Sequence, residues 1–183
     1  MRKLIACINA TLDGICDHNV IVPDDEIHLH YAELLQIADD ILYGRITYQL
    51  MEFWPTVVAN PTGIKATDDF AVTIDNINKI VFSHTLKELP WKNSRLAQKS
   101  LKEEVETLKQ QPGRDILVGS PSLIMQALNL NVVDEFQLCV HPVIEGKGLQ
   151  LFKNISERID LNLIKTKTFK GGAIVLYYKP IRK

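Results

Sequence analysis

The sequence has no excess charge of either sign, no paired cysteines and no long apolar run. Its 183 residues include 21 Lys and Arg against 22 Asp and Glu, which argues against a general nucleic-acid or membrane-surface binder. Cys7, Cys16 and Cys139 sit among apolar neighbours without Cys-x-x-Cys spacing, so we expect reduced thiols and no metal site. No segment has the roughly 18 consecutive apolar residues of a membrane span, and the amino-terminal run is too short for a signal peptide. We therefore expect a cytoplasmic protein.

Two common nucleotide-binding motifs are also missing. The chain contains neither a Walker loop nor a Gly-x-Gly-x-x-Gly, so the usual glycine-rich phosphate cradles are excluded. The length and the ordinary globular composition predict one domain over residues 1–183 with a core large enough to fold without metal or disulfide.

Apolar strand-like runs alternate with helical patterns along most of the chain. We expect strands at 3–10, 39–44, 78–85, 114–120 and 135–144, and helices at 23–38, 45–54, 100–113 and 122–131. Residues 56–70 read as a loop with a short helix near their end, and 161–170 with 173–180 as a terminal hairpin. This order predicts a single three-layer α/β domain, with a mostly parallel sheet, helices on both faces and a C-terminal antiparallel hairpin.

Small, hydroxyl and basic residues follow several of the predicted strands. Gly44 and Arg45 end one strand, Ser83 and His84 another, and Gly119 a third. Ligands of such sheets bind at the carboxyl ends of the strands, so we expect a nucleotide-like anion there, with Arg45 and His84 on one terminal phosphate. Each feature alone also fits a plain helix cap or a solvated surface arginine.

Several segments together resemble a known family. "CINATLDGI", "LYGRITYQLMEFWP", "KIVFSHTL", "DILVGSPSLIMQAL", "VDEFQLCVHPVIEGKGLQLF" and "TKTFKGGAIVLYY" occur in this order. Over about residues 5 to 180 the chain resembles the dihydrofolate reductase superfamily. Within it, the chain is most similar to the bacterial branch related to the C-terminal reductase domain of the bifunctional riboflavin-biosynthesis deaminase–reductase. The resemblance implies an NADPH-dependent reductase that transfers hydride to a small pteridine-like or ribosylaminopyrimidine-like heterocycle.

The resemblance also implies which residues hold the cofactor. Gly44, Arg45 and Thr47 match the motif for its phosphates, with Arg45 nearest the 2′-phosphate. The other implied contacts are Ser83, His84 and Thr85 at the adenosine ribose-phosphate, Gly119, Ser120 and Leu123 at the pyrophosphate and nicotinamide, and Cys7 and Ile15 near the nicotinamide amide. The family often has Gly-Gly where this chain has Gly119-Ser120.

A proton must reach the reduced substrate, and its source is open. Asp13, His28 and water are the candidates, since a histidine titrates near neutrality. Asp13 also fits a turn in Asp-Gly, and His28 a partly exposed helix residue. Asn9, Tyr31 and Trp54 are candidate substrate contacts. The early helix carboxylate of true folate reductases is not clearly present.

Two other functions remain as alternatives, and the sequence also bears on the oligomeric state. One is a genuine dihydrofolate reductase, and the other is a nucleotide-binding protein without catalysis. The chain lacks the His-x-Glu and Cys-x-x-Cys of a zinc deaminase, so within the riboflavin pathway it could supply only the reduction. The apolar "AIVLYY" edge predicts a homodimer formed through the terminal strands, with neither nucleic acid nor membrane as a partner.

Overall fold

The computed structural model describes residues 1–181, which fold around one eight-stranded sheet with the order β4-β3-β2-β5-β1-β6-β8-β7. The strands are β1 (Leu4–Thr11), β2 (Ala38–Gly44), β3 (Asn78–Phe82), β4 (Ser94–Leu96), β5 (Asp115–Val118), β6 (Glu135–His141), β7 (Leu161–Thr168) and β8 (Ile174–Pro180). The helices are α1 (Asp25–Gln36), α2 (Arg45–Met51), α3 (Trp54–Ala59), α4 (Lys65–Asn76), α5 (Leu101–Gln110) and α6 (Pro121–Asn129).

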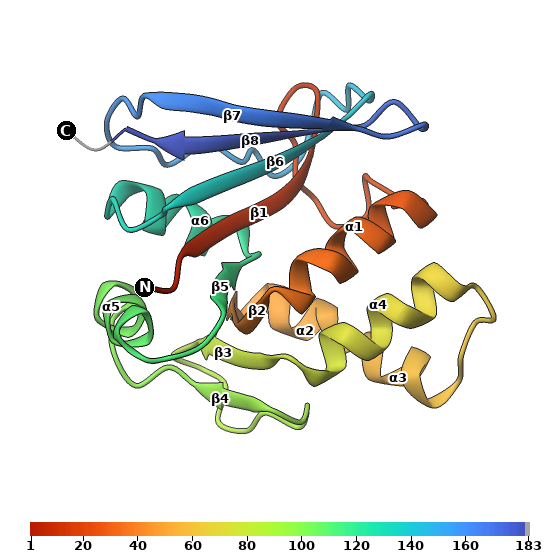
Figure 1. Cartoon of the computed structure of the whole chain (residues 1–183), viewed down its shortest axis with the longest axis horizontal. Helices are drawn as coiled ribbons and strands as arrows, with labels where there is room; N and C mark the ends of the chain where they lie inside the picture. Colours follow the sequence, from red (N-terminus) through yellow and green to blue (C-terminus); the bar gives the residue numbers. More distant parts are fainter. Residues whose placement is uncertain (182–183) are drawn as a thin grey trace.

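The sheet is parallel from β4 to β6 and antiparallel at its other edge. β8 pairs antiparallel with both β6 and β7, which confirms the predicted C-terminal hairpin. Figure 1 shows α1, α3 and α4 on one side of the sheet and α5 and α6 on the other. The fold is therefore the predicted three-layer α/β domain, in which helices join the parallel strands except between β3 and β4.

Alternating residues of the central strands supply the two halves of the core. In β1, Leu4 and Ala6 pack with Val105 and Ile124 under α5 and α6. The intervening Ile5 and Cys7 belong to a second cluster with residues of α1 and α4. A strand buried on both faces has no polar side, which explains the continuous apolar run that begins at Leu4.

The prediction for residues 56–70 was partly right. The short helix expected near their end is present as the first half of α4, but their first residues belong to α3, and only residues 60–64 between the two helices form a loop. Pro55 lies in the first turn of α3, where its missing N–H costs no hydrogen bond. The helix predicted from Arg45 to residue 54 is divided at residues 52–53, and the three-residue strand β4 was not predicted.

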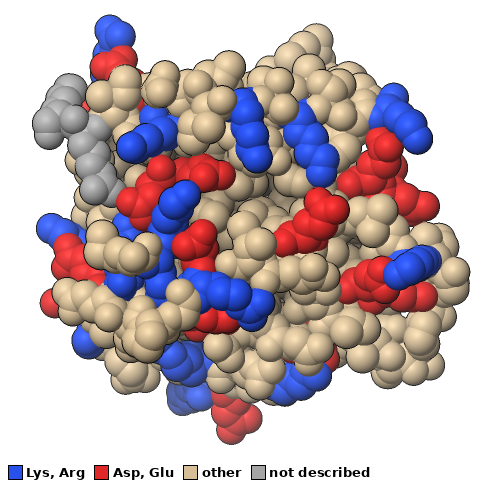
Figure 2. Space-filling model, in the orientation of Figure 1, with Lys and Arg blue, Asp and Glu red and all other residues tan. Residues whose placement is uncertain are grey.

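Other boundaries agree with the sequence patterns to within a few residues. Helix α5 begins at a capping box, in which Ser100 and Glu103 satisfy each other's backbone amides. None of the helices in residues 1–181 is long and apolar enough to cross a membrane. On the face shown in Figure 2, basic and acidic side chains are interspersed.

Candidate functional site

The carboxyl ends of β3, β2 and β5 lie next to one another. Gly44 pairs with Phe82, so Arg45 and Ser83 follow paired positions on neighbouring strands. The Gly44 amide donates to Ser120 Oγ over 2.8 Å, which joins the end of β2 to the turn after β5. The structure thus brings the segments beginning at Arg45, Ser83 and Gly119 to one end of the sheet.

Ser120 connects two strand ends and does not cap its own helix. Its hydroxyl makes no hydrogen bond to the first turn of α6, because it accepts the Gly44 amide instead. A Cβ on Gly44 would lie 3.5 Å from Ser122 Oγ and 3.9 Å from Leu123 Cγ. The side chain of Leu123 is buried below this turn. The bare backbone of Gly44 therefore lies beside the start of α6.

Arg45 is an exposed cation without a carboxylate partner in the described residues. Within residues 1–181, its guanidinium makes one hydrogen bond, from Nη1 to the neutral Gln49 Oε1, over 3.1 Å. Thr47 lies half-buried two residues further along α2. The guanidinium is consequently available to an external anion.

The segment after β3 is built as a turn. Ser83 Oγ accepts the amides of Thr85, over 3.1 Å, and Leu86, over 3.0 Å, so the Ser83 hydroxyl is already engaged. His84 and Thr85 are exposed at the tip of this turn. Any ligand at this strand end would meet those two side chains before Ser83.

Strand β1 extends beyond the end of its neighbour β5. Pairing with β5 ends at Ala6 and Val118, whereas pairing with β6 continues to Thr11 and His141. Residues 7–11 therefore have one edge that β5 does not cover. Gly119 turns away at this point, and a Cβ on it would lie 4.0 Å from the Cys7 carbonyl oxygen.

Cys7 and Ile15 are buried on the two sides of this open edge. Burial raises the pKa of the Cys7 thiol to about 12, so the thiol stays neutral at ordinary pH. Ile15 forms an isolated bridge with Gln150, and its amide donates to Thr11 Oγ1 over 2.9 Å. Both residues can offer backbone and apolar contacts here.

Asp13 joins two loops through its carboxylate, the turn role that the Asp-Gly pair also predicted. Its carboxylate accepts the Thr11 hydroxyl over 2.6 Å and the amides of Gly146 over 2.7 Å and Glu145 over 3.2 Å. These bonds, that from Thr11 foremost, lower the pKa of Asp13 to about 2. The bonds therefore favour the ionised form of Asp13, which makes it a weaker candidate for the proton donor. The Asp-Gly turn and the later Glu-Gly-Lys-Gly turn are thus two halves of one structure.

His28 belongs to an aromatic cluster of α1, α3 and α4, which weakens its prediction as a proton donor. Its ring centroid lies 5.8 Å from that of Trp54 and 5.7 Å from that of Phe70, and Nδ1 lies 3.5 Å from Thr67 Oγ1. Burial lowers the pKa of His28, so the ring is neutral at pH 7. Trp54, also in this cluster, is half-buried between the helices.

Asn9 and Tyr31, two predicted substrate contacts, are joined directly. The Tyr31 hydroxyl donates to Asn9 Oδ1 over 3.1 Å. His141 Nε2 lies 3.0 Å from the same oxygen, a contact that no local sequence pattern predicted. Asn9, on β1, and His141, on β6, are 132 positions apart, so only the parallel pairing of these strands reveals the cluster.

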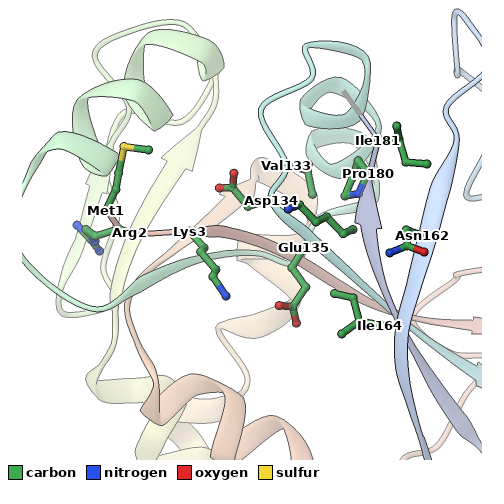
Figure 3. A pocket seen from close by; sticks show the side chains of 11 residues that line it. Met1, Arg2, Lys3, Val133, Asp134, Glu135, Asn162, Ile164, Pro180 and Ile181 are labelled. Atoms are coloured by element: carbon green, nitrogen blue, oxygen red, sulfur yellow. The ribbon is translucent and has the colours of Figure 1, made fainter. Parts of the chain in front are cut away.

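A separate groove of about 680 Å³ lies at the opposite end of the sheet (Figure 3). It is lined by residues at the amino ends of β1 and β6 and by the β7–β8 pair, among them Lys3, Glu135, Asn162 and Lys179. Parallel sheets bind ligands at their carboxyl ends, so this groove is not the site predicted from the strand ends.

The comparisons with known proteins agree on the family. The family model for the RibD C-terminal domain matches residues 2–175. The uncharacterized protein YyaP of Bacillus subtilis is 32% identical over 97% of this chain and 94% of its own length. YwjB of the same organism, also uncharacterized, is 26% identical over 97% of both chains.

Solved structures share the fold. A pyrimidine reductase-like protein from Corynebacterium diphtheriae superposes with a TM-score of 0.68 at 20% identity, covering 100% of this chain and 93% of its own. A diaminohydroxyphosphoribosylaminopyrimidine deaminase/5-amino-6-(5-phosphoribosylamino)uracil reductase from Thermotoga maritima gives a TM-score of 0.67 at 18% identity. That match covers 98% of this chain and 57% of the Thermotoga chain. By its sequence, and with this fold, the chain belongs to the RibD C-terminal domain family.

Proposed function

We propose that the protein is an NADPH-dependent reductase that transfers a hydride to a small pteridine-like or ribosylaminopyrimidine-like heterocycle. The observation that carries this proposal is the meeting of three strand ends, held together by the bond from the Gly44 amide to Ser120 Oγ. Membership of the RibD C-terminal domain family supports a reductase at this position. The reductases named among the similar structures support the same reaction class.

The residues at the strand ends fit a phosphorylated dinucleotide. Arg45 offers a guanidinium unpaired with any carboxylate of residues 1–181, suited to the 2′-phosphate. The backbone at Gly44 and Gly119 and the Ser122 hydroxyl suit the phosphate linkage. His84 and Thr85 would lie along the ribose-phosphate, with Thr47 and the Ser83 turn behind them. Leu123, Cys7 and Ile15 would contact the nicotinamide end.

The protein's own part in the reaction is to bind and orient. When bound, the nicotinamide supplies the hydride, so the residues need only align the two rings and exclude competing water. The open edge of β1 at residues 7–11 would hold the reacting ends. The proposal assigns the proton to water, because Asp13 is an anion and His28 is neutral within its aromatic cluster.

Arg45→Ala tests the cofactor site. Loss of a charge-assisted contact to the 2′-phosphate should weaken NADPH binding by about 1.5–3 kcal/mol, or about 10- to 150-fold. NADH has no 2′-phosphate, so its affinity should change little. Titration followed by quenching of the protein's tryptophan fluorescence measures both affinities.

Arg158→Ala is the matched control, since Arg158 is another exposed arginine, paired with Asp160. It should leave both affinities unchanged. Equal losses for NADPH and NADH in Arg45→Ala would remove the 2′-phosphate role. A turnover assay with dihydrofolate distinguishes this proposal from a genuine folate reductase, which would reduce that substrate efficiently.

The run "AIVLYY" is not an edge as predicted, because β8 lies between β6 and β7; we infer that two copies associate through the edge strand β7 instead. Almost every residue of β7 is exposed, and Leu163 and Ile164 are 49% and 52% exposed. An uncovered apolar edge favours pairing with another strand. Sedimentation velocity at micromolar concentration should give twice the 20.8 kDa chain mass, and Ile164→Lys should give the single mass. A monomer of the unmodified protein would refute the dimer.

A further inference from the structure

The cluster of Asn9, Tyr31 and His141 fixes the orientation of one amide. Asn9 Oδ1 lies 3.1 Å from the Tyr31 hydroxyl and 3.0 Å from His141 Nε2. Three elements contribute: Asn9 comes from β1, Tyr31 from α1 and His141 from β6. Cys139 Sγ lies 3.5 Å from the same nitrogen of His141. An asparagine held by two neighbours from different elements cannot turn its amide freely.

Tyr31 donates to Asn9 Oδ1, and His141 can donate to the same oxygen through Nε2. Burial raises the pKa of Tyr31 well above 10.0, so its hydroxyl keeps its proton and can donate. Burial lowers the pKa of His141, so its ring is neutral, and the tautomer that carries the proton on Nε2 donates to Asn9 Oδ1. Two donors saturate the carbonyl oxygen of the Asn9 amide. The amide nitrogen must then point away from the cluster.

The Asn9 amide nitrogen is left with unused hydrogen atoms. Nδ2 donates to no atom within residues 1–181, and the one side-chain atom there that is buried without a partner is Gln137 Oε1. The Nδ2 group is therefore accessible. Asn9 is half-buried and lies two residues beyond Cys7 on the edge of β1 that β5 does not cover. A donor with fixed direction thus lies where the proposed reaction would hold its substrate.

We propose that Asn9 Nδ2 donates a hydrogen bond to a carbonyl oxygen of the substrate ring, and that Tyr31 and His141 are positioning residues for this amide. The inference rests on the proposed function and narrows its substrate to an oxo-substituted heterocycle. A site built to donate to an oxygen discriminates strongly against an analogue that presents an amino group there, because two donors then face each other.

A pair of ring compounds tests the direction of the hydrogen bond. The probes are pterin, which is 2-amino-4-oxopteridine, and 2,4-diaminopteridine, each titrated calorimetrically with and without saturating NADPH. The unmodified protein should bind pterin about tenfold more tightly than the diamino compound. Asn9→Asp exchanges the donor for an acceptor and should reverse the preference, while Asn9→Ala should bring the ratio close to one.

Variants of His141 and Tyr31 test whether these residues orient the Asn9 amide, and for His141 a conservative and a disruptive variant can be compared. Gln places a donor near the position of histidine Nε2, so His141→Gln should keep the preference for pterin, whereas His141→Leu should lose most of it. Tyr31→Phe should reduce it about fivefold. Thermal midpoints of the variants distinguish lost folding from lost discrimination, because among the variants only a folded one with an unchanged ratio counts against the proposal.

The outcomes separate this inference from the proposed function. If NADPH binds normally but Asn9→Asp and Asn9→Ala leave the ratio of the pterin and 2,4-diaminopteridine affinities unchanged, the role of Asn9 is overturned and the proposed reductase is not. Failure of the unmodified protein to bind either ring compound would also overturn it. A reversed preference in a protein that does not bind NADPH would support the Asn9 site and refute the reductase.

Discussion

At the residue scale, several buried polar side chains stabilise the fold through hydrogen bonds within the protein. Lys79 is fully buried, and its ammonium donates to the carbonyls of Asp75 over 2.8 Å and Ile77 over 3.0 Å. It also lies 4.0 Å from the centre of the Trp91 ring. The hydrogen-bonding groups of such side chains already have partners within the protein, so they are not available to bind a ligand. Asn9 differs because its amide oxygen has hydrogen-bond partners, whereas its amide nitrogen has none within residues 1–181.

His30 makes the stability of the protein dependent on pH. Its ring is buried among Tyr31, Phe169 and Tyr177, and burial lowers its pKa from 6.5 to about 4. Below pH 6.5 His30 is protonated in the unfolded chain but stays neutral in the folded protein. The free energy of unfolding therefore falls as the pH drops from about 6.5 to about 4. This group should account for roughly 1–2 kcal/mol of the loss.

Urea denaturation of the unmodified protein and of His30→Phe at pH 7 and pH 4.5 measures that contribution. The variant should lose less stability between the two values, since it lacks the titrating ring. His28 and His141 titrate in both proteins and cancel in the comparison. An equal loss in both would show that His30 does not carry the effect.

At the element scale, the loop after β1 and the loop after β6 are built against each other. Asp13 accepts the amides of Glu145 and Gly146, and Asp17 accepts that of Leu149 over 2.5 Å. The backbone of Gly148 has a φ of 139°, and a Cβ there would lie 2.1 Å from Asp17 Oδ2. Glycine at this position lets the two loops meet.

Gly148→Ala should therefore destabilise the protein by about 1–3 kcal/mol, through backbone strain and displacement of the Asp17 carboxylate. Gly146→Ala is the matched control, because Gly146 has a φ of 79° but nothing within 4 Å of its missing Cβ. Thermal or urea denaturation measures both. If the two variants lost the same stability, strain alone would be the cause and the contact with Asp17 would be unimportant.

The elements that the sequence predicted well are those with a clear period and a clear end. Helix α5 has its capping box, and the hairpin of β7 and β8 turns at Gly171-Gly172. The sequence signal for α3 is ambiguous, because Pro55 fits the end of the helix predicted from Arg45 and also the start of a new helix. Strand β4 has three residues, too few to show an alternation.

At the scale of the whole molecule, topology decides which distant residues meet. A parallel sheet brings its strand ends to one edge, so the neighbourhood of Arg45, Ser83 and Gly119 followed from the order of elements. The positions of Asp13 and His28 did not follow, because they depend on which loop or helix packs against each. His141 joins Asn9 only through the register of β1 with β6, which no local pattern encodes.

The arrangement of the whole sheet also leaves two candidate binding regions at opposite ends. One is the set of carboxyl ends around Gly44, Ser83 and Gly119. The other is the groove of about 680 Å³ near Lys3, Glu135 and Lys179. At the strand ends, Arg45 has a guanidinium without a carboxylate partner in residues 1–181, and Gly44 and Gly119 have no side chain, features that suit a phosphate.

The most direct test of the account is an NMR titration of the isotope-labelled protein with NADPH, followed by amide chemical shifts. We predict that the largest changes fall on Gly44 and Arg45, on residues 83–85 and on residues 119–122, and that Arg45→Ala weakens them. Changes confined to the groove around Lys3, Glu135 and Lys179, or no changes at millimolar NADPH, would contradict the central claim that neighbouring strand ends form the cofactor site.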